Sequence, residues 1–324
     1  MHFNSELLTQ SLNQIQIFYN QNYKNIDLHY DHDYAFIYAC SIGQLDLIQW
    51  LWKTSKYEVE NNKLNARLID IHVDREFPFQ MICEGGLCCS GRMECTLLSD
   101  CDDKCVESGP GLKCGHLESA IWLINLSYKI KSPINIDSQL DHFLYICAEN
   151  GNVGVMKWLI ERSIINGKSI DLHFGDDDYH TDALICIACE SGQLEIMKLL
   201  YNIIKDLDLN LDNNFLFRNS CENGYVDIVK WLLENSKNPI NIRMMNEYPF
   251  RISCKNGYLE LAKLLYQLGI DNNDPINITA KHHYAFIRSS ENNHIETAKW
   301  LTSLCSIYHL SIDDDEIIDY HISK

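Results

Sequence analysis

The sequence has few residues that interrupt helices and no stretch long enough to cross a membrane. It contains 6 prolines and 15 glycines in 324 residues, and these are the two residue types least compatible with a helix interior. No apolar run approaches the roughly 18 residues of a spanning helix, and no basic segment precedes an apolar stretch near Met1. We therefore expect a helical, soluble chain that is not secreted, has no transmembrane segment and resides inside the cell, in the cytoplasm.

Positive charge is also scarce. The chain has 27 Lys and Arg against 45 Asp and Glu, which gives a net charge of -18 at pH 7. Nucleic acids and anionic membranes bind basic surfaces, so this balance excludes both as partners. The hydrophobic fraction of 46% is that of a globular protein, which argues against disorder.

The common catalytic signatures are missing. The sequence has no G-x-x-x-x-G-K-[ST] phosphate loop, no G-x-G-x-x-G after a strand and no H-E-x-x-H pair. Acidic residues and histidines do gather in residues 171–182 and could hold a divalent cation, but we interpret this cluster as a lengthened, solvated loop. The sequence thus predicts a protein that is not an enzyme and has no cofactor, apart from zinc in the cysteine-rich segment discussed below.

One helical pattern recurs seven times. Each copy starts from a Gly or Asn, has Leu, Val or Ile two positions later and has Leu eight positions later. The anchors are Gly43, Gly115, Gly151, Gly192, Gly224, Gly257 and Asn293. The apolar positions form one stripe of a helix, and an acid at +3 can pair with a Lys at +6. A short apolar segment precedes each anchor, so the pattern predicts two helices joined by a tight turn with positive φ.

Between the helix pairs lies a four-residue signature in which apolar and polar residues alternate. Such alternation predicts a short extended segment, a finger. The signature is assigned to Ile26–His29, Ile69–His72, Ile134–Asp137, Ile170–His173, Leu209–Asp212, Ile240–Arg243 and Ile276–Thr279.

A unit of about 33 residues that combines a finger with a helix pair resembles the ankyrin repeat. Gly224–Leu233 carries the second half of that motif, whereas the usual Thr-Pro-Leu-His opening is replaced by Tyr-Ala-Phe or Tyr-Pro-Phe, as in Tyr34–Phe36 and Tyr248–Phe250. The resemblance implies an all-α ankyrin-repeat solenoid of stacked helix pairs with short extended fingers. The style of the repeats is similar to arrays of giant DNA viruses of amoebae, which implies a viral factor acting on host proteins.

The expected domain organisation follows from the repeats. Residues 1–25 form an N-terminal capping helix, 26–310 the array and 311–324 an acidic C-terminal tail. The individual repeats are expected at 29–63, 72–131, 138–167, 178–208, 212–239, 246–272 and 281–307.

A cysteine-rich insertion, residues 86–114, interrupts the turn of the second repeat. It holds six of the 14 cysteines, at Cys88, Cys89, Cys95, Cys101, Cys105 and Cys114. Three interpretations stay open: disulfides, a thiolate zinc site bordered by His116, and a reduced loop. Five other cysteines fall three residues before a turn, where we interpret them as small buried hydrophobes.

Binding is the function that such a scaffold supports. We predict a monomeric protein–protein interaction scaffold whose concave finger surface contacts a partner of basic or mixed charge. The alternative hypothesis is a metal-binding or redox-sensitive module, residues 86–114, displayed on the scaffold. The predicted partner-binding residues are His29, Asp31, His32, His72, Asp74, Asp137, His173, Asp176, Asp212, Arg243, Thr279 and His282.

Overall fold

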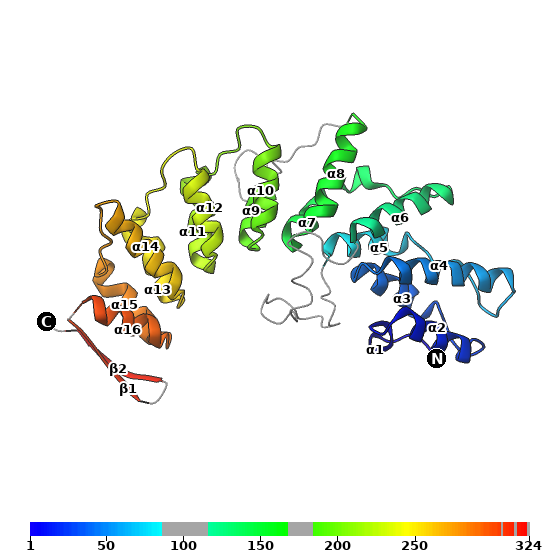
Figure 1. Ribbon diagram of the computed structural model, residues 1–324, viewed down its shortest axis with the longest axis horizontal. Coiled ribbons are helices and arrows are strands. Elements are labelled where there is room, and N and C mark those ends of the chain that lie inside the picture. The colour runs from blue at the N-terminus through cyan, green and yellow to red at the C-terminus, as the bar shows by residue number, and fades with distance from the viewer. Residues whose placement is uncertain (86–115, 168–183, 306, 314–315, 323–324) are drawn as a thin grey trace. The chain divides into compact units, whose positions relative to one another are not determined.

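The computed structural model describes residues 1–85, 116–167, 184–305, 307–313 and 316–322 (Figure 1). Two N-terminal helices precede a series of helix pairs. The helices are α1 (Ser5–Leu8), α2 (Leu12–Asn22), α3 (Tyr30–Ser41), α4 (Leu45–Glu60), α5 (Val73–Glu84), α6 (His116–Lys129), the short 3-10 helix η2 (Ile136–Ser138), α7 (Leu140–Asn150), α8 (Val153–Ile165), α9 (Leu184–Glu190), α10 (Leu194–Ile203), α11 (Leu211–Asn223), α12 (Val226–Asn235), α13 (Met244–Lys255), α14 (Leu259–Asp271), α15 (Ala280–Glu291) and α16 (Ile295–Leu304). None of the helices in these ranges combines the length and the apolar composition that crossing a membrane requires.

The chain divides into two units. The first comprises Met1–Phe174 with Ala183–Ala188 and Glu195–Ile203, and the second comprises the remainder. In the first unit α3 packs against α5 and α5 against α7, while α4 packs against α6 and α6 against α8. In the second unit α11, α13 and α15 pack in succession, and each also contacts its own second helix. Repeats of each unit therefore stack on their neighbours, as the pattern predicts.

The second repeat is the one that the insertion interrupts. Helix α5 ends at Glu84 and is capped by Gly85, which has a left-handed backbone, and α6 begins at His116. The two helices contact each other as the first and second helix of one pair. The six insertion cysteines lie outside the described residues. His116 is buried, and its Nε2 lies 2.9 Å from the carbonyl oxygen of Ser41, so this nitrogen already has a partner in the first repeat.

The first helices carry most of the largest buried side chains of the core. Six of them carry a fully buried phenylalanine, and the residue four positions later is a buried Cys or Ser. These phenylalanines are Phe36, Phe79, Phe143, Phe217, Phe250 and Phe286. The five cysteines interpreted as small hydrophobes are fully buried, which confirms that interpretation; they are Cys40, Cys83, Cys189, Cys221 and Cys254. Burial raises the pKa of each of these thiols, which opposes formation of a reactive thiolate.

The turns between paired helices have the positive φ that the sequence predicts. This holds at six of the seven anchors, namely Gly43, Gly151, Gly192, Gly224, Gly257 and Asn293, while Gly115 lies outside the described residues. A close approach adds to the need for glycine. At Gly224, a Cβ atom would lie 2.6 Å from Cδ1 of Tyr258, the residue that follows the next turn. Tyr225 covers Gly192 in the same way.

After two of the turns, the next residue also bonds to the repeat before it. The Asn152 amide donates to the carbonyl oxygen of Ile82 at 3.0 Å, and the Tyr225 hydroxyl donates to that of Glu190 at 3.2 Å. These carbonyls stand at the C-terminal end of a first helix, where no partner exists within the helix itself. At these two turns the position after the turn therefore links successive repeats.

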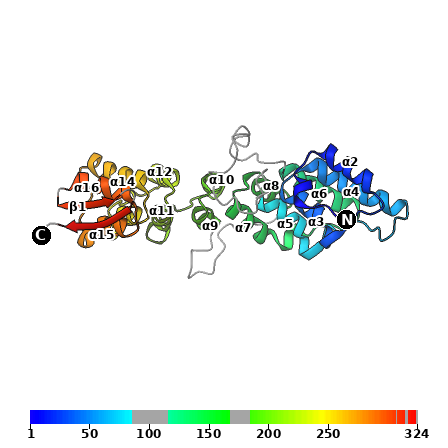
Figure 2. The same cartoon turned by 90° about the horizontal axis from the view of Figure 1, so that it is seen from below.

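The two ends of the chain differ in detail from the sequence expectations. The N-terminal segment forms two helices, α1 and α2, instead of one. The C-terminal segment, expected to be an acidic tail, contains strands β1 (Tyr308–Asp313) and β2 (Glu316–Ile322), paired antiparallel with Tyr308 opposite Ile322. Figure 2 shows this hairpin beside α15 and α16. The apolar and polar residues that alternate along both strands favour this pairing.

Candidate partner-binding surface

The four-residue signature folds as a turn and not as an extended finger. In five repeats a side-chain oxygen at its second position accepts a hydrogen bond from the backbone N–H of the fourth residue. In the third repeat Asn135 Oδ1 accepts instead from the Ser138 N–H, and Ile170–His173 lies outside the described residues. Asp27 Oδ1 lies 3.0 Å from the His29 nitrogen, and Asp70 Oδ1 lies 2.9 Å from the His72 nitrogen. This is an Asx turn, which explains why Asp or Asn recurs at the second position. In the first repeat the first and third positions, Ile26 and Leu28, are buried.

In the fifth repeat the predicted frame of the signature is wrong by two residues. Asp208 Oδ1 accepts from the Asn210 nitrogen at 2.9 Å, so the turn spans Leu207–Asn210 and not Leu209–Asp212. Three leucines alternate with polar residues here, and the pattern alone fits either frame. Asp212 is therefore not equivalent to His29 but lies two positions further along the chain.

Three consecutive residues with left-handed backbone follow the signature in five repeats. In the first repeat the φ values are 48°, 54° and 66° for Asp31, His32 and Asp33. The triplets are 31–33, 74–76, 212–214, 245–247 and 281–283. Each residue other than glycine costs about 1 kcal/mol or more in this conformation, so the surrounding contacts must hold it.

In four of the triplets the side chain of the third residue bonds to the side chain of the fourth signature residue. His29 Nδ1 lies 2.5 Å from Asp33 Oδ1, and His72 Nδ1 lies 2.8 Å from Glu76 Oε2. The same i,i+4 link joins Asn210 to Asn214 at 2.7 Å and Arg243 to Glu247 at 2.8 Å.

The same residues also connect one repeat to the next. Asp33 Oδ2 accepts from Arg67 at 2.8 Å and from the backbone N–H of Asp70 at 3.1 Å. His72 Nε2 contacts the carbonyl oxygen of Ser132 at 3.0 Å, and Arg243 forms an ion pair with Asp274. The fourth signature residue therefore supports the fold.

Two arginines in the second unit brace the triplets from five to six residues further along the same elements, α11 and α13. Arg218 donates from Nε to the Asn213 carbonyl at 3.2 Å and from Nη2 to the Asp212 carbonyl at 3.1 Å. Arg251 makes the equivalent bonds to Asn246 at 2.7 Å and Met245 at 3.2 Å. The guanidinium group thus fixes the backbone that carries the first two triplet residues.

Those first two residues, which we call the tip pair, are exposed in every triplet. The side chains of Asp31 and His32 are 66% and 79% exposed, whereas that of Asp33 is 1% exposed. The tip pairs are Asp31 with His32, Asp74 with Arg75, Asp212 with Asn213, Met245 with Asn246, and Lys281 with His282.

The predicted partner-binding residues separate into three groups. Asp31, His32, Asp74, Asp212 and His282 belong to tip pairs, and Asp137 is exposed in η2. A second group supports the fold, because His29, His72, Arg243 and Thr279 bond within their own signature or triplet. The third group, His173 and Asp176, lies outside the described residues. Within the described ranges, no group of three or more His, Cys, Asp or Glu is placed to hold a metal ion.

Asp33 gives the first repeat a specific acid sensitivity. Burial raises the pKa of its carboxyl group, but hydrogen bonds from His29, the Asp70 N–H and Arg67 outweigh burial and lower the pKa below its ordinary value of 3.8. Because the folded pKa is lowered, the stabilisation is complete above pH 3.8 and disappears as the pH falls through the folded value.

We therefore expect Asp33→Asn to lower the urea midpoint relative to the parent chain at pH 7, with the difference shrinking below about pH 4. Chemical denaturation followed by circular dichroism measures this. Asp31→Asn is the matched control, because its exposed carboxylate makes none of these bonds, and its midpoint should equal that of the parent. If the difference in urea midpoint between Asp33→Asn and the parent chain stayed constant down to pH 3, the stabilisation would not come from the ionised Asp33 carboxylate.

The described fold defines a class, the helical-repeat proteins whose paired helices meet at a left-handed turn. The family model of ankyrin repeats in three copies matches residues 185–276 and 217–313. Over 129 residues the chain is 28% identical to an ankyrin-repeat protein of Acanthamoeba polyphaga mimivirus. Residues 185–313 of this chain match ankyrin repeats, and the chain resembles an ankyrin-repeat protein of a giant virus, as its sequence suggested. The alignment covers 36% of this chain and 20% of the relative, so the chain matches only about a fifth of that protein.

Proposed function

We propose that this chain is a non-enzymatic scaffold that binds a protein partner through its tip pairs. Ankyrin repeats generally mediate protein–protein interactions, and the family match supports this class of function. The observation that carries the proposal is the recurrence of an exposed pair of residues on the same rigid support in five repeats. Residues held in place before binding lose little conformational entropy when a partner arrives.

The tip pairs differ in chemistry while their support stays alike. Asp31 and Asp74 give the first unit two exposed carboxylates, joined by His32 and Arg75. In the second unit the pairs are polar, apolar and basic in turn. The net charge of -18 and the exposed carboxylates of Asp31 and Asp74 favour a partner whose segment in contact with the first unit is basic or of mixed charge. We further propose that the chain acts as a monomer and contacts host proteins inside the cell; its similarity to a viral protein fits such a role.

The test replaces tips without disturbing their support. Asparagine tolerates left-handed backbone, so we combine Asp31→Asn, His32→Asn, Asp74→Asn and Arg75→Asn. Peptides selected from a displayed library on the parent chain should be rich in Lys and Arg, and this variant should bind them at least about tenfold more weakly. Its melting temperature should be unchanged.

A control removes four charged side chains away from the tips, against three charged side chains and one histidine in the tip variant. Lys263 pairs with Glu260 at 3.0 Å on α14, and Lys299 pairs with Glu296 at 3.1 Å on α16, all on the outer helix surface. Replacing these four residues by Gln should leave peptide binding as in the parent chain. If the Gln variant loses binding and the Asn variant keeps it, the partner contacts the second helices and the proposal is wrong.

A further inference from the structure

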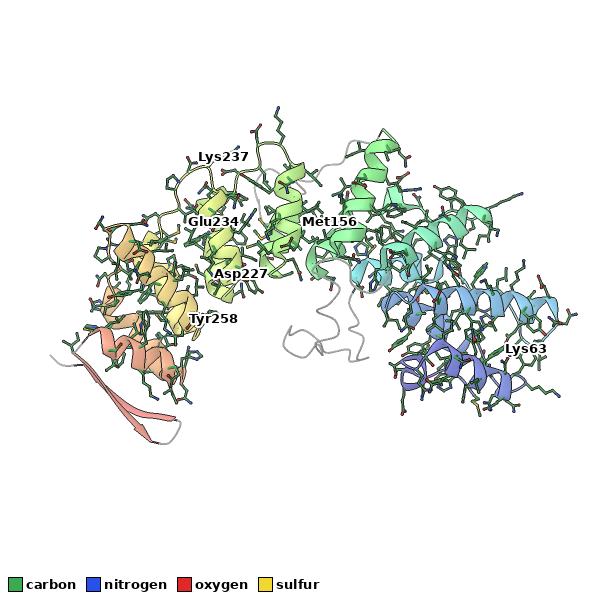
Figure 3. The ribbon with its side chains drawn as sticks, in the orientation of Figure 1. Lys63, Met156, Asp227, Glu234, Lys237 and Tyr258 are labelled. Carbon is green, nitrogen blue, oxygen red and sulfur yellow. The ribbon has the colours of Figure 1, made fainter. Side chains whose placement is uncertain are left out.

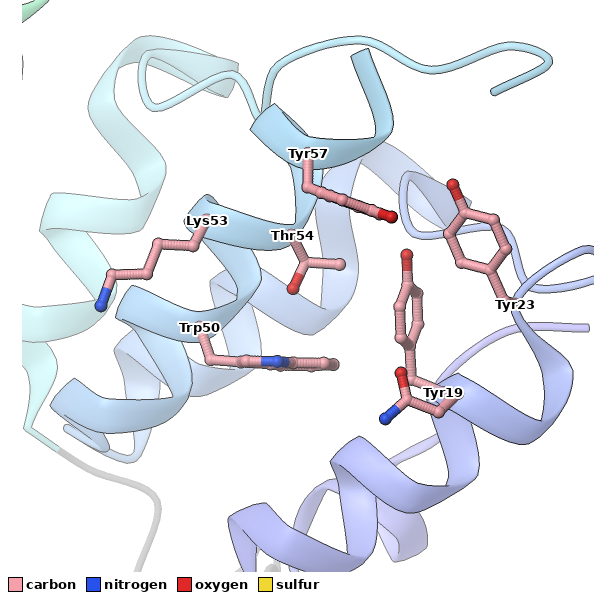
Figure 4. A pocket seen from close by; sticks show the side chains of 7 residues that line it. Tyr19, Tyr23, Trp50, Lys53, Thr54 and Tyr57 are labelled. Carbon is pink, nitrogen blue, oxygen red and sulfur yellow. The ribbon is translucent and has the colours of Figure 1, made fainter. Parts of the chain in front are cut away.

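A pocket of about 550 Å³ lies between α2 and α4 in the first unit, on a different part of the chain from the tips (Figure 4). Its lining consists of Tyr19, Asn20, Tyr23, Trp50, Lys53, Thr54 and Tyr57. Four of these seven side chains are aromatic, and the volume falls in the range of small-ligand sites. Aromatic walls in this number make the pocket a candidate for recognising one chemical group.

The rings stand at steep angles to one another. Tyr19 and Trp50 have ring centroids 5.5 Å apart at 87°, and Tyr19 and Tyr23 have centroids 5.6 Å apart at 81°. Tyr23 and Tyr57 meet at 6.4 Å and 60°. Rings at these angles direct both faces and edges toward the pocket, so that a bound group would contact aromatic surface on several sides.

Contacts behind the pocket hold the rings in place. The Tyr19 hydroxyl donates to the buried carboxylate of Glu58 at 2.6 Å. Phe3 is fully buried and packs edge-on against Trp50, with centroids 6.1 Å apart. The pocket walls are therefore formed before any ligand arrives.

The ring cluster already accommodates one cation of the chain itself. The Lys63 ammonium lies 4.8 Å from the Tyr23 ring centroid and 5.7 Å from that of Tyr19. Glu58 neutralises this charge at 2.5 Å. In Figure 4 the Lys53 ammonium points away from the rings, so its aliphatic stem contributes to the wall while its charge stays in solvent.

We propose that this pocket binds a quaternary ammonium group, the trimethylated side chain of a lysine in a protein partner. The faces of Trp and Tyr attract cations, and a methylated ammonium is weakly hydrated, so it leaves water at lower cost than a bare lysine. The net charge of -18 favours a cationic ligand, and the exposed side of the pocket leaves room for the lysine stem. The pocket shares no residue with the tip pairs, so this proposal does not depend on whether the tip pairs bind a partner.

Isothermal titration of the full chain tests the proposal with three probes. A peptide with trimethyllysine should bind at least about fivefold more tightly than the same peptide with a neutral tert-butyl isostere, because only the charged group gains from the ring faces. Phosphocholine should bind more weakly than the trimethyllysine peptide. Equal binding of the isostere would show simple hydrophobic capture, and tighter binding of phosphocholine would assign the site to a lipid headgroup; either result overturns the proposal.

Variants identify the site. Tyr57 is 55% exposed, so Tyr57→Leu should fold normally and weaken trimethyllysine binding at least about fivefold. Tyr128→Leu is the matched control, because Tyr128 is equally exposed but lies on α6 outside the pocket, and its affinity should be that of the parent. Lys53→Gln removes a nearby like charge and should tighten cation binding about twofold. Weaker binding by Lys53→Gln would mean that the pocket prefers an anion.

Discussion

Gly224→Val is expected to lower the free energy of unfolding by about 2–5 kcal/mol. The backbone at Gly224 has a φ of +76°, which costs a β-branched residue about 1–2 kcal/mol. A Cβ atom there would also lie 2.6 Å from the Tyr258 ring, and relieving such a clash costs about 1–3 kcal/mol. Because Tyr258 begins the second helix of the next repeat (Figure 3), the damage should extend across the contact between two repeats.

Gly167 separates the two contributions. It has a φ of +73°, but a Cβ atom there would meet nothing within 4 Å. Gly167→Ala should therefore show the backbone cost alone, and Gly224→Ala should exceed it by the cost of displacing Tyr258. Thermal and urea unfolding measure both. An unchanged melting temperature for Gly224→Val would mean that the turn has been placed wrongly.

Lys63→Met is expected to destabilise the first unit by about 3–5 kcal/mol, because it leaves a buried carboxylate without its cation. The side chains of Lys63 and Glu58 are 11% and 2% exposed, and their charged atoms are 2.5 Å apart. Lys63, labelled in Figure 3, also donates to the carbonyl oxygen of Ile26 at 2.9 Å. Equilibrium urea unfolding of the variant should show the loss.

The neighbouring pair of Lys56 and Glu60 provides the comparison. Their side chains are 64% and 61% exposed at a separation of 3.7 Å, so Lys56→Met should change stability by less than about 0.5 kcal/mol. A double variant, Glu58→Met with Lys63→Met, should recover most of the stability, since it removes both charges. If Lys63→Met and Lys56→Met cost the same, Glu58 is not isolated from water as the structure has it.

The helix pairs could be predicted from sequence because their determinants are local. Each turn, apolar stripe and ion pair lies within about ten residues of its anchor. The predicted i,i+3 pairs of Glu195 with Lys198 and of Glu260 with Lys263 are present, at 2.7 Å and 3.0 Å. These contacts follow from the geometry of a single helix, which the spacing of residues already specifies.

The left-handed triplets could not be predicted in the same way. At none of its three positions does the triplet Asp31–Asp33 have the same residue as Met245–Glu247, so the triplets have no common sequence. Part of the support of Asp31–Asp33 also comes from the next repeat, through the backbone N–H of Asp70. The available signal was the polar pair at i,i+4, as in Arg243 and Glu247, which follows an Asp or Asn two residues before. The alternation of apolar and polar residues suggested an extended finger. It reflects which side chains are buried, and a turn can bury alternate side chains as well as a strand can.

The aromatic pocket escaped prediction for a different reason. Its rings come from α2 and α4, with Tyr19 and Trp50 separated by nearly a full repeat unit of chain. Only the packing of the N-terminal helices brings them together. In the sequence each ring is an ordinary member of an amphipathic helix.

The buried cysteines give this chain a built-in set of probes for local opening. Each of the first six repeats has at least one buried thiol in its first helix, including Cys40, Cys147 and Cys254. A water-soluble alkylating reagent can reach such a sulfur only after the repeat around it has opened. Labelling rates of individual peptides, followed by mass spectrometry, would therefore give the opening free energy of one repeat at a time, without introducing any foreign label.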